Sequence, residues 1–218
     1  MDFNLQAYQA DHLLHLSAKP ERRLSILENA RHRWLEMDGV VQSAMSLSQP
    51  EHLCLPHQQS IAERLPAQAS RILELGLGGG DLTRHLGARW PEARHDCVDL
   101  DAEILTLFQQ FFQPSTGGAP RLHHADALHF LLESREQYDL VLLDLFSQDG
   151  NPLLLFQAPI YQALANCLRG TLIINLLPRT HLELAQAKKL AEEWIGPTTA
   201  HGVPGYRNVI LHATNLSA

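Results

Sequence analysis

A glycine-rich segment is the part of this sequence best suited to bind a ligand. An apolar run beginning at Arg71 is followed by Gly76, Gly78, Gly79 and Gly80, and then by an amphipathic stretch. Residues without a Cβ let the backbone turn sharply and approach a ligand closely. The pattern predicts a strand, a ligand-binding turn and a helix, and we call residues 76–80 the glycine loop. A tight strand-to-helix connection that binds nothing is the alternative.

The carboxylates around the glycine loop indicate which ligand it suits. Asp99 follows Gly76 by 23 residues, at the end of the next apolar run, where a carboxylate can accept hydrogen bonds from a ribose diol. Asp81 stands where a dinucleotide-binding turn would have its third glycine, and its charge would repel a pyrophosphate. With Glu74 just before the loop, the site suits a sulfonium or an ammonium group. The other interpretation of Asp81 is a helix N-cap.

Two further carboxylates follow later apolar runs. Asp126 comes directly after the third run, and it could bind an exocyclic adenine amine or cap the next helix. Asp144 ends the fourth run. Because ligands of open α/β sheets bind beyond the carboxyl ends of the strands, we expect Asp144 to face the substrate. A structural role in capping the following turn is the alternative for Asp144.

From Leu73 onward, short apolar runs alternate with longer amphipathic stretches. This alternation is typical of a parallel sheet covered by helices on both faces, so the fold class is α/β. The expected strands are Arg71–Leu75, His95–Leu100, Arg121–His123, Tyr138–Leu143, Thr171–Leu176 and Asn208–Ala213. The expected helices are Asp81–Arg89, Ala102–Phe112, Ala127–Glu133, Pro159–Cys167 and His181–Trp194.

The N-terminal part of the chain has a different pattern. Asp38 and Gly39 lie between two strand-like runs, and this pair favours a type I′ hairpin turn, in which both central residues have positive φ. Leu53–Leu65 has the pattern of a short amphipathic helix. We expect residues 1–65 to form a small β hairpin appendage with a helical lead-in, and residues 66–218 to form a nucleoside-binding catalytic domain.

Composition excludes several classes of protein. The 24 acidic and 17 basic residues give a net charge of -7, which does not suit a protein that must neutralise nucleic-acid phosphates. The three cysteines are far apart in the sequence and mostly lie in apolar runs, which is typical of free thiols in a reducing compartment. We therefore expect a cytoplasmic protein.

Neither export nor membrane insertion is expected. No run approaches the roughly 20 apolar residues of a membrane span, and the N-terminus lacks the pattern of a signal peptide. A metal site is not expected either. The densest group of potential ligands comprises His123, His124, Asp126 and His129, and it does not have the spacing of a common metal motif.

Several motifs follow one another in a fixed order over most of the chain. They are Met37–Gln42, Ile72–Gly80, Val98–Asp101, Ala125–Ala127, Tyr138–Asp144, Pro152, Ile160–Tyr161 and Thr171–Leu176. In this order they resemble the spermidine synthase (polyamine aminopropyltransferase) family. That family lies within the broader class I S-adenosylmethionine-dependent methyltransferase fold. The resemblance implies a transferase with this Rossmann-like fold and with S-adenosylmethionine, or its decarboxylated form, as cofactor.

The resemblance also implies roles for individual residues. Gln42 and the glycine loop would contact the nucleoside and amino-acid part of the cofactor. Asp99 would contact the ribose, and Asp126 with Ala127 would contact the adenine. Asp144 would accept an amine substrate, either as a base or as a charge partner.

This chain departs from the family pattern at several positions. The glycine loop of the family usually contains an aspartate where this chain has Gly79. A second aspartate usually follows the catalytic one by three residues, where this chain has Ser147, and Asp149 could replace it. Ser147 and Asp149 are therefore candidate contacts to a small cationic or amine substrate.

Two other functions fit the same sequence. Methyl transfer from S-adenosylmethionine is the first, because the segment Glu74-Leu-Gly-Leu-Gly also matches the glycine loop of methyltransferases. The second is a non-catalytic nucleoside-binding protein, since a fold does not guarantee activity. The predicted hairpin could also support a homodimer.

Overall fold

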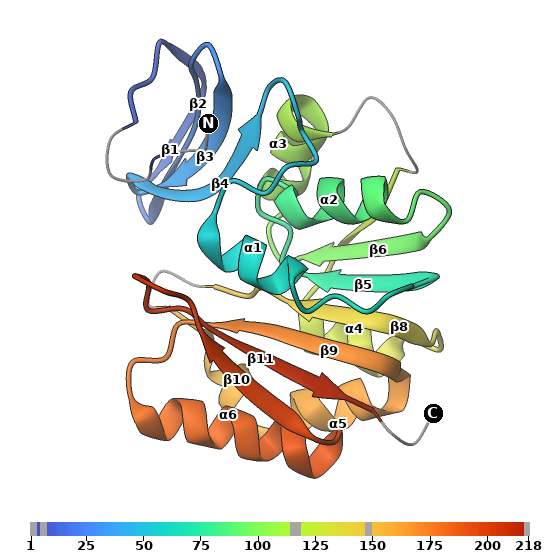
Figure 1. The fold of residues 1–218 in the computed structure, drawn as a ribbon. Helices are drawn as coiled ribbons and strands as arrows, with labels where there is room; N and C mark the ends of the chain where they lie inside the picture. The colour runs from blue at the N-terminus through green and yellow to red at the C-terminus, as the bar shows by residue number, and fades with distance from the viewer. Residues whose placement is uncertain (1–3, 5–7, 114–118, 147–149, 216–218) are drawn as a thin grey trace.

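A seven-stranded sheet forms the centre of the molecule (Figure 1). The computed structural model describes residues 4, 8–113, 119–146 and 150–215. The strand order is β10-β11-β9-β8-β5-β6-β7, and the four neighbouring pairs from β9 to β7 are parallel. The strands are β5 (Arg71–Leu75), β6 (Arg94–Asp99), β7 (Arg121–His124), β8 (Tyr138–Leu143), β9 (Leu168–Leu176), β10 (Thr198–Gly202) and β11 (Val209–Thr214).

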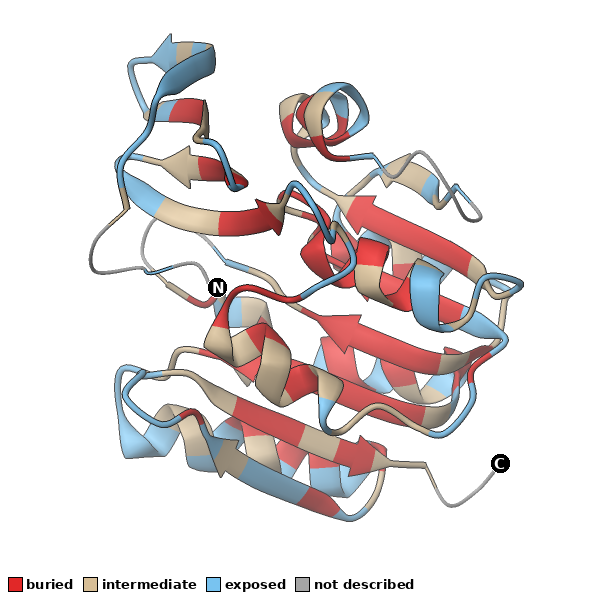
Figure 2. Cartoon of the chain, turned by 45° about the horizontal axis from the view of Figure 1, so that its top comes forward, coloured by how far each residue is buried: buried red, intermediate tan, exposed pale blue. Residues whose placement is uncertain are grey.

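The helices cover both faces of this sheet, which confirms the expected α/β class. They are α1 (Pro56–Ala62), α2 (Asp81–Arg89), α3 (Ala102–Leu107), α4 (Ala127–Glu133), α5 (Ala158–Cys167) and α6 (His181–Trp194). Apolar residues of α4, α5 and α6 form one core with the sheet, and those of α1 and α2 form another on the opposite face. Figure 2 shows the buried residues concentrated along the central strands. Burial on both faces explains why β8 and the C-terminal part of β9 consist mostly of apolar residues.

A second sheet precedes the central one along the chain. Its four strands pair in an antiparallel manner in the order β1 (His12–Lys19), β2 (Arg22–Glu28), β3 (His32–Met37) and β4 (Val40–Ser46). Asp38 and Gly39 in the turn from β3 to β4 have φ of 51° and 79°, so the predicted hairpin is confirmed. Trp34 of the hairpin is fully buried and packs with Leu55, so this residue takes part in the chain's own core.

The sequence reading missed β1 and β2, so the N-terminal part is a four-stranded sheet rather than a hairpin alone. Most residues of β1 are exposed on both faces, and such a strand lacks the alternation of polar and apolar residues on which the prediction depends. Strand β10 was not predicted either, because it is a polar segment at the edge of the central sheet and has no apolar run.

Most of the remaining elements begin or end within a few residues of their expected bounds. The expected helix at 102–112 is an α-helix only to Leu107 and continues as one π-helical turn, Phe108–Phe112. The expected helix at 53–65 is shorter, because α1 begins at Pro56, which is well suited to the first turn of a helix. A short 3₁₀ helix, Leu153–Phe156, precedes α5. Within the described residues, no helix is both long and apolar enough to cross a membrane.

Candidate functional site

Two adjoining cavities lie at the carboxyl ends of the parallel strands. The first has a volume of about 400 Å³ and is lined in part by the glycine loop, and the second has a volume of about 950 Å³. The residues that line both cavities are Arg22, Met37, Gln42, Asp144 and Phe146. The second cavity also lies against the N-terminal sheet, through Lys19, Arg23 and Val41. The four-stranded sheet therefore forms part of the wall of the site.

The glycine loop makes a sharp turn close to the backbone of Asp144. Gly76 has φ of +91°, and a Cβ at this position would lie 2.3 Å from the Asp144 carbonyl oxygen. Gly78 has φ of +54° and lines the first cavity with Gly76. Gly80 has φ of +69°, but a Cβ there would meet the Phe108 ring at 2.2 Å. Gly80 does not line the cavity. Its close packing against Phe108 therefore explains why this position needs a residue without a Cβ.

Asp99 fixes the conformation of the glycine loop. Its Oδ2 accepts a hydrogen bond from the backbone N–H of Leu77 at 2.9 Å, and its Oδ1 accepts one from Asp101 at 2.9 Å. Burial raises the pKa of Asp99, while the N–H groups of Leu77 and Gly78 and the charge of Arg22 oppose this rise. Asp99 also lines the first cavity, and its contact with a ribose stays a prediction.

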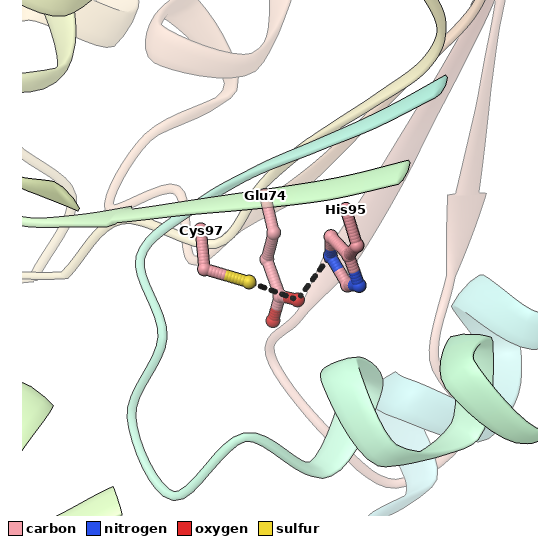
Figure 3. Close-up of side chains that lie close together, drawn as sticks. All are labelled: Glu74, His95 and Cys97. Atoms are coloured by element: carbon pink, nitrogen blue, oxygen red, sulfur yellow. Dashed lines mark hydrogen bonds and ion pairs between the residues drawn. The ribbon is translucent and has the colours of Figure 1, made fainter. Parts of the chain in front are cut away.

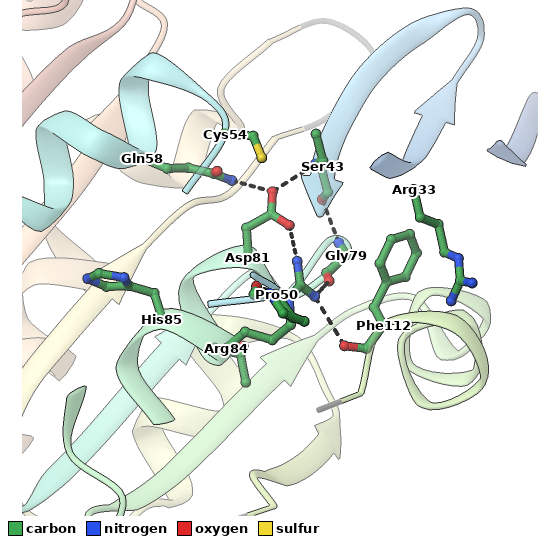
Figure 4. Close-up of polar contacts among 12 residues, drawn as sticks. Arg33, Ser43, Pro50, Cys54, Gln58, Gly79, Asp81, Arg84, His85 and Phe112 are labelled. Carbon is green, nitrogen blue, oxygen red and sulfur yellow. Dashed lines mark hydrogen bonds and ion pairs between the residues drawn. The ribbon is translucent and has the colours of Figure 1, made fainter. Parts of the chain in front are cut away.

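Asp81 is not a free negative charge, and this corrects the expected contribution of this residue to an acidic site. Its carboxylate is almost fully buried and forms an ion pair with Arg84, one turn further along α2 (Figure 4). The other carboxylate oxygen accepts hydrogen bonds from Ala44 of β4 and from Gln58 of α1, both at 2.9 Å. Burial raises the pKa of Asp81, and these three partners oppose the rise. Asp81 is not an N-cap either, since Gly80 takes that position.

Glu74 lies on the face of the sheet that α2 covers (Figure 3). Its Oε2 accepts a hydrogen bond from Thr83 at 2.7 Å and a weak one from the Cys97 thiol at 3.7 Å. The His95 Nε2 lies 3.1 Å from the same oxygen. Burial raises the pKa of Cys97 well above its usual value, and Glu74 adds to the rise. Glu74 also borders the first cavity, so its charge acts on a ligand bound there.

Asp126 and Ala127 lie at the start of α4, next to the first cavity. Asp126 is the N-cap of α4, because its Oδ1 accepts a hydrogen bond from the backbone N–H of His129 at 2.9 Å. Both interpretations of Asp126 are therefore compatible with the structure. The neighbouring histidines contact residues other than Asp126. His123 Nε2 lies 2.8 Å from Asp96 Oδ1, and His124 Nε2 lies 3.0 Å from the Leu100 carbonyl oxygen.

Asp144 occupies the junction of the two cavities. It directly follows β8, is partly buried and lines both cavities. Burial raises the pKa of Asp144 from 3.8 to about 7, a hydrogen bond from Asn175 opposes the rise, and the charges of Glu74 and Asp81 add to it. A carboxyl group with this pKa can exchange a proton near neutral pH.

The sequence reading missed Asn175 and Asn208. Asn175 is fully buried in β9, and its Nδ2 donates to Asp144 Oδ1 at 2.8 Å. Asn208 lies just before β11, and its Nδ2 donates to Asn175 Oδ1 at 3.0 Å. A single amide within the apolar run Thr171–Leu176 is a signal that could have identified Asn175.

Gln42, Ser147 and Asp149 complete the set of predicted site residues. Gln42 lines both cavities, and its amide donates to the Val40 carbonyl oxygen at 3.2 Å. Ser147 and Asp149, the candidate substrate contacts, lie outside the described residues.

Comparisons with known proteins agree with this architecture. A family model described as "Methyltransferase domain" matches residues 72–168. A probable spermidine synthase from Corynebacterium glutamicum superimposes with a TM-score of 0.76 at 18% identity, covering 94% of this chain and 81% of the other. Human methyltransferase-like protein 13 has a TM-score of 0.64 at 24% identity, with coverage of 72% and 80%. The fold is the Rossmann-like class I fold of S-adenosylmethionine-dependent transferases.

Curated relatives make the assignment more specific. Polyamine aminopropyltransferase 1 of Pseudomonas aeruginosa is 26% identical over 193 residues, which are 85% of this chain and 66% of the relative. Polyamine aminopropyltransferase of Sodalis glossinidius is 30% identical over 169 residues, or 75% and 58%. The chain therefore has a spermidine synthase-like class I fold. It spans no more than about two thirds of the length of these relatives.

Proposed function

We propose that this protein transfers an aminopropyl group from decarboxylated S-adenosylmethionine to a small amine. The observation that carries the proposal is the position of Asp144, which lines two adjoining cavities at once. A carboxylate at such a junction can contact a donor in one cavity and an acceptor in the other. The names of the curated relatives support the same activity.

The first cavity suits the nucleoside part of the donor. Gly76 and Gly78 bring the backbone of the glycine loop to the cavity, and Asp99 supplies a carboxylate next to it. The side chains of Leu100 and Ile104 offer apolar surface for a purine ring. Glu74 and Asp144 provide negative charge for a sulfonium, which the -7 net charge of the chain had suggested only in general terms.

The second cavity suits the amine. When bound, the donor supplies an electrophilic carbon next to its sulfur, so that a C–N bond forms as the C–S bond breaks and methylthioadenosine leaves. Asp144 accepts the proton that the attacking nitrogen must lose, and its pKa of about 7 matches that task near neutral pH. Gln42 and the N-terminal sheet hold the two ligands against each other, and such positioning accelerates the reaction.

The test is to incubate the protein with either form of the cofactor and a panel of monoamines and diamines, and to identify the products by mass spectrometry. We expect methylthioadenosine and an aminopropylated amine from the decarboxylated form. Asp144→Asn should abolish turnover while titration calorimetry still detects binding of the decarboxylated cofactor. Formation of S-adenosylhomocysteine would instead support methyl transfer, and binding without any product would support a non-catalytic protein.

A further inference from the structure

The second cavity contains a chain of two amides that ends on Asp144. Asn208 donates to Asn175, and Asn175 donates to Asp144, with distances of 3.0 Å and 2.8 Å between the bonded atoms. The three residues come from three separate segments: the end of β8, the interior of β9 and the residue before β11. Asn175 lies opposite Ile210 in the antiparallel pairing of β9 with β11, which brings Asn208 close to it.

The direction of the two amide hydrogen bonds decides how they act on Asp144. A side-chain amide has a donor side and an acceptor side, and rotation by half a turn exchanges them. Asn208 occupies the acceptor side of Asn175, so the NH₂ group of Asn175 is directed at Asp144. In the opposite orientation, the carbonyl oxygen of Asn175 would face the carboxylate and repel its charge.

We propose that Asn175 and Asn208 are positioning residues that keep Asp144 available as a proton acceptor. Asn208 fixes the amide of Asn175, and Asn175 stabilises the ionised form of Asp144. This inference rests on the proposed function only for its role in transfer; the effect on Asp144 itself is independent of any substrate.

The surroundings of Asp144 make this stabilisation necessary. The charges of Glu74 from β5 and Asp81 from α2 disfavour its ionisation. Arg22 of β2 lines both cavities with Asp144, but its guanidinium is paired with Asp101 and Glu103. His57 of α1 also lines the second cavity, but burial lowers its pKa to about 4, so it is neutral near pH 7. The hydrogen bond from Asn175 lowers the pKa of Asp144 and so opposes burial and the two acidic charges.

The experiment measures the protonation of Asp144 directly. Protein labelled with ¹³C at the aspartate carboxyl groups is titrated by NMR, and the resonance that disappears in Asp144→Asn is assigned to Asp144. We expect a midpoint near 7 in the unsubstituted protein. In Asn175→Leu we expect a midpoint higher by about one unit or more, since a hydrogen bond to a carboxylate is lost. Asn208→Ala should raise it by a smaller amount.

Asn215→Leu is the matched control. Asn215 donates to the Leu168 carbonyl oxygen at the opposite end of β9, so its loss should leave the Asp144 midpoint unchanged. Because Asn175 is fully buried, Asn208→Ala tests the inference if Asn175→Leu does not fold. Unchanged midpoints in the folded variants at both positions would overturn the inference.

Activity measurements separate this inference from the proposed function. If transfer occurs, the acidic limb of its pH profile should move in Asn175→Leu by the same amount as the NMR midpoint. If the midpoint moves but no amine is ever modified, the positioning role stands and the proposed function fails.

Discussion

Removal of Arg84 should destabilise the protein more than any change to a surface charge. Arg84 is 3% exposed and forms an ion pair with Asp81, which is also 3% exposed. Its other nitrogens donate to the carbonyl oxygens of Pro50 at 2.9 Å and Phe112 at 3.2 Å. These partners come from the segment after β4 and from the π-helical turn, so one side chain joins distant parts of the chain around the glycine loop (Figure 4).

The magnitude follows from what Arg84→Met leaves behind. The substitution removes the charge partner of a buried carboxylate, and breaking one side of a buried pair costs about 3–5 kcal/mol. Asp81 keeps its hydrogen bonds from Ala44 and Gln58, which reduces the cost, whereas the carbonyl oxygens lose donors, which adds to it. We expect the free energy of unfolding to fall by about 4 kcal/mol.

Urea unfolding followed by circular dichroism measures this change, with the midpoint and the slope compared between variants. The double variant Asp81→Leu with Arg84→Met removes both charges of this buried pair, so part of the lost stability should return. Lys188→Met is the control, because it breaks an exposed pair with Glu192 in α6 and should cost less than about 0.5 kcal/mol. A loss below about 1 kcal/mol in Arg84→Met would refute the argument that this buried pair stabilises the fold.

Three further changes test other parts of the site. The folded-state pKa of Asp144 is raised from 3.8 to about 7, so its protonated form stabilises the fold at low pH. This contribution to the free energy of unfolding falls by about 4 kcal/mol as pH rises from about 4 to 7. The difference in unfolding free energy between the unsubstituted protein and Asp144→Asn should fall by the same amount over that pH range. Gly76→Ala should cost more than about 2 kcal/mol in urea unfolding, because its Cβ would overlap a carbonyl oxygen at positive φ, whereas Gly202→Ala, with open space around it, should be nearly neutral. Asp99→Ala should weaken nucleoside binding in calorimetry by about tenfold or more, because the N–H of Leu77 loses its acceptor.

Local sequence patterns were sufficient for much of the central domain. The bounds of β5, β8, α2, α4 and α6 match the expected ranges at both ends. Their apolar periodicity is strong, and turns or polar residues mark their limits, so tertiary contacts add little to the prediction. The N-terminal sheet was predicted only in part, because β1 is mostly exposed and its position depends on its pairing with β2.

The candidate site also contains some residues that the sequence pattern predicted and others that it did not. Asp99, Asp126 and Asp144 lie beside a cavity at the strand ends, as the order of strands and carboxylates had suggested. Their assignment to a cofactor and a substrate stays a prediction. Asn175 and Asn208 escaped notice because they are 33 residues apart and meet only through the pairing of β9 with β11.

The order of apolar runs, glycines and carboxylates along the chain was enough to predict the class of fold, the place of the glycine loop and the carboxylates that could surround a cationic ligand. The partners of these carboxylates became visible only in the folded structure. Asp81 and Asp144 both border the first cavity, yet Asp81 is paired with Arg84, whereas Asp144 accepts a hydrogen bond from Asn175 and also lines the second cavity. The reason is physical: the free energy of a buried charge depends on the partners and the water around it, and residues distant in sequence supply both.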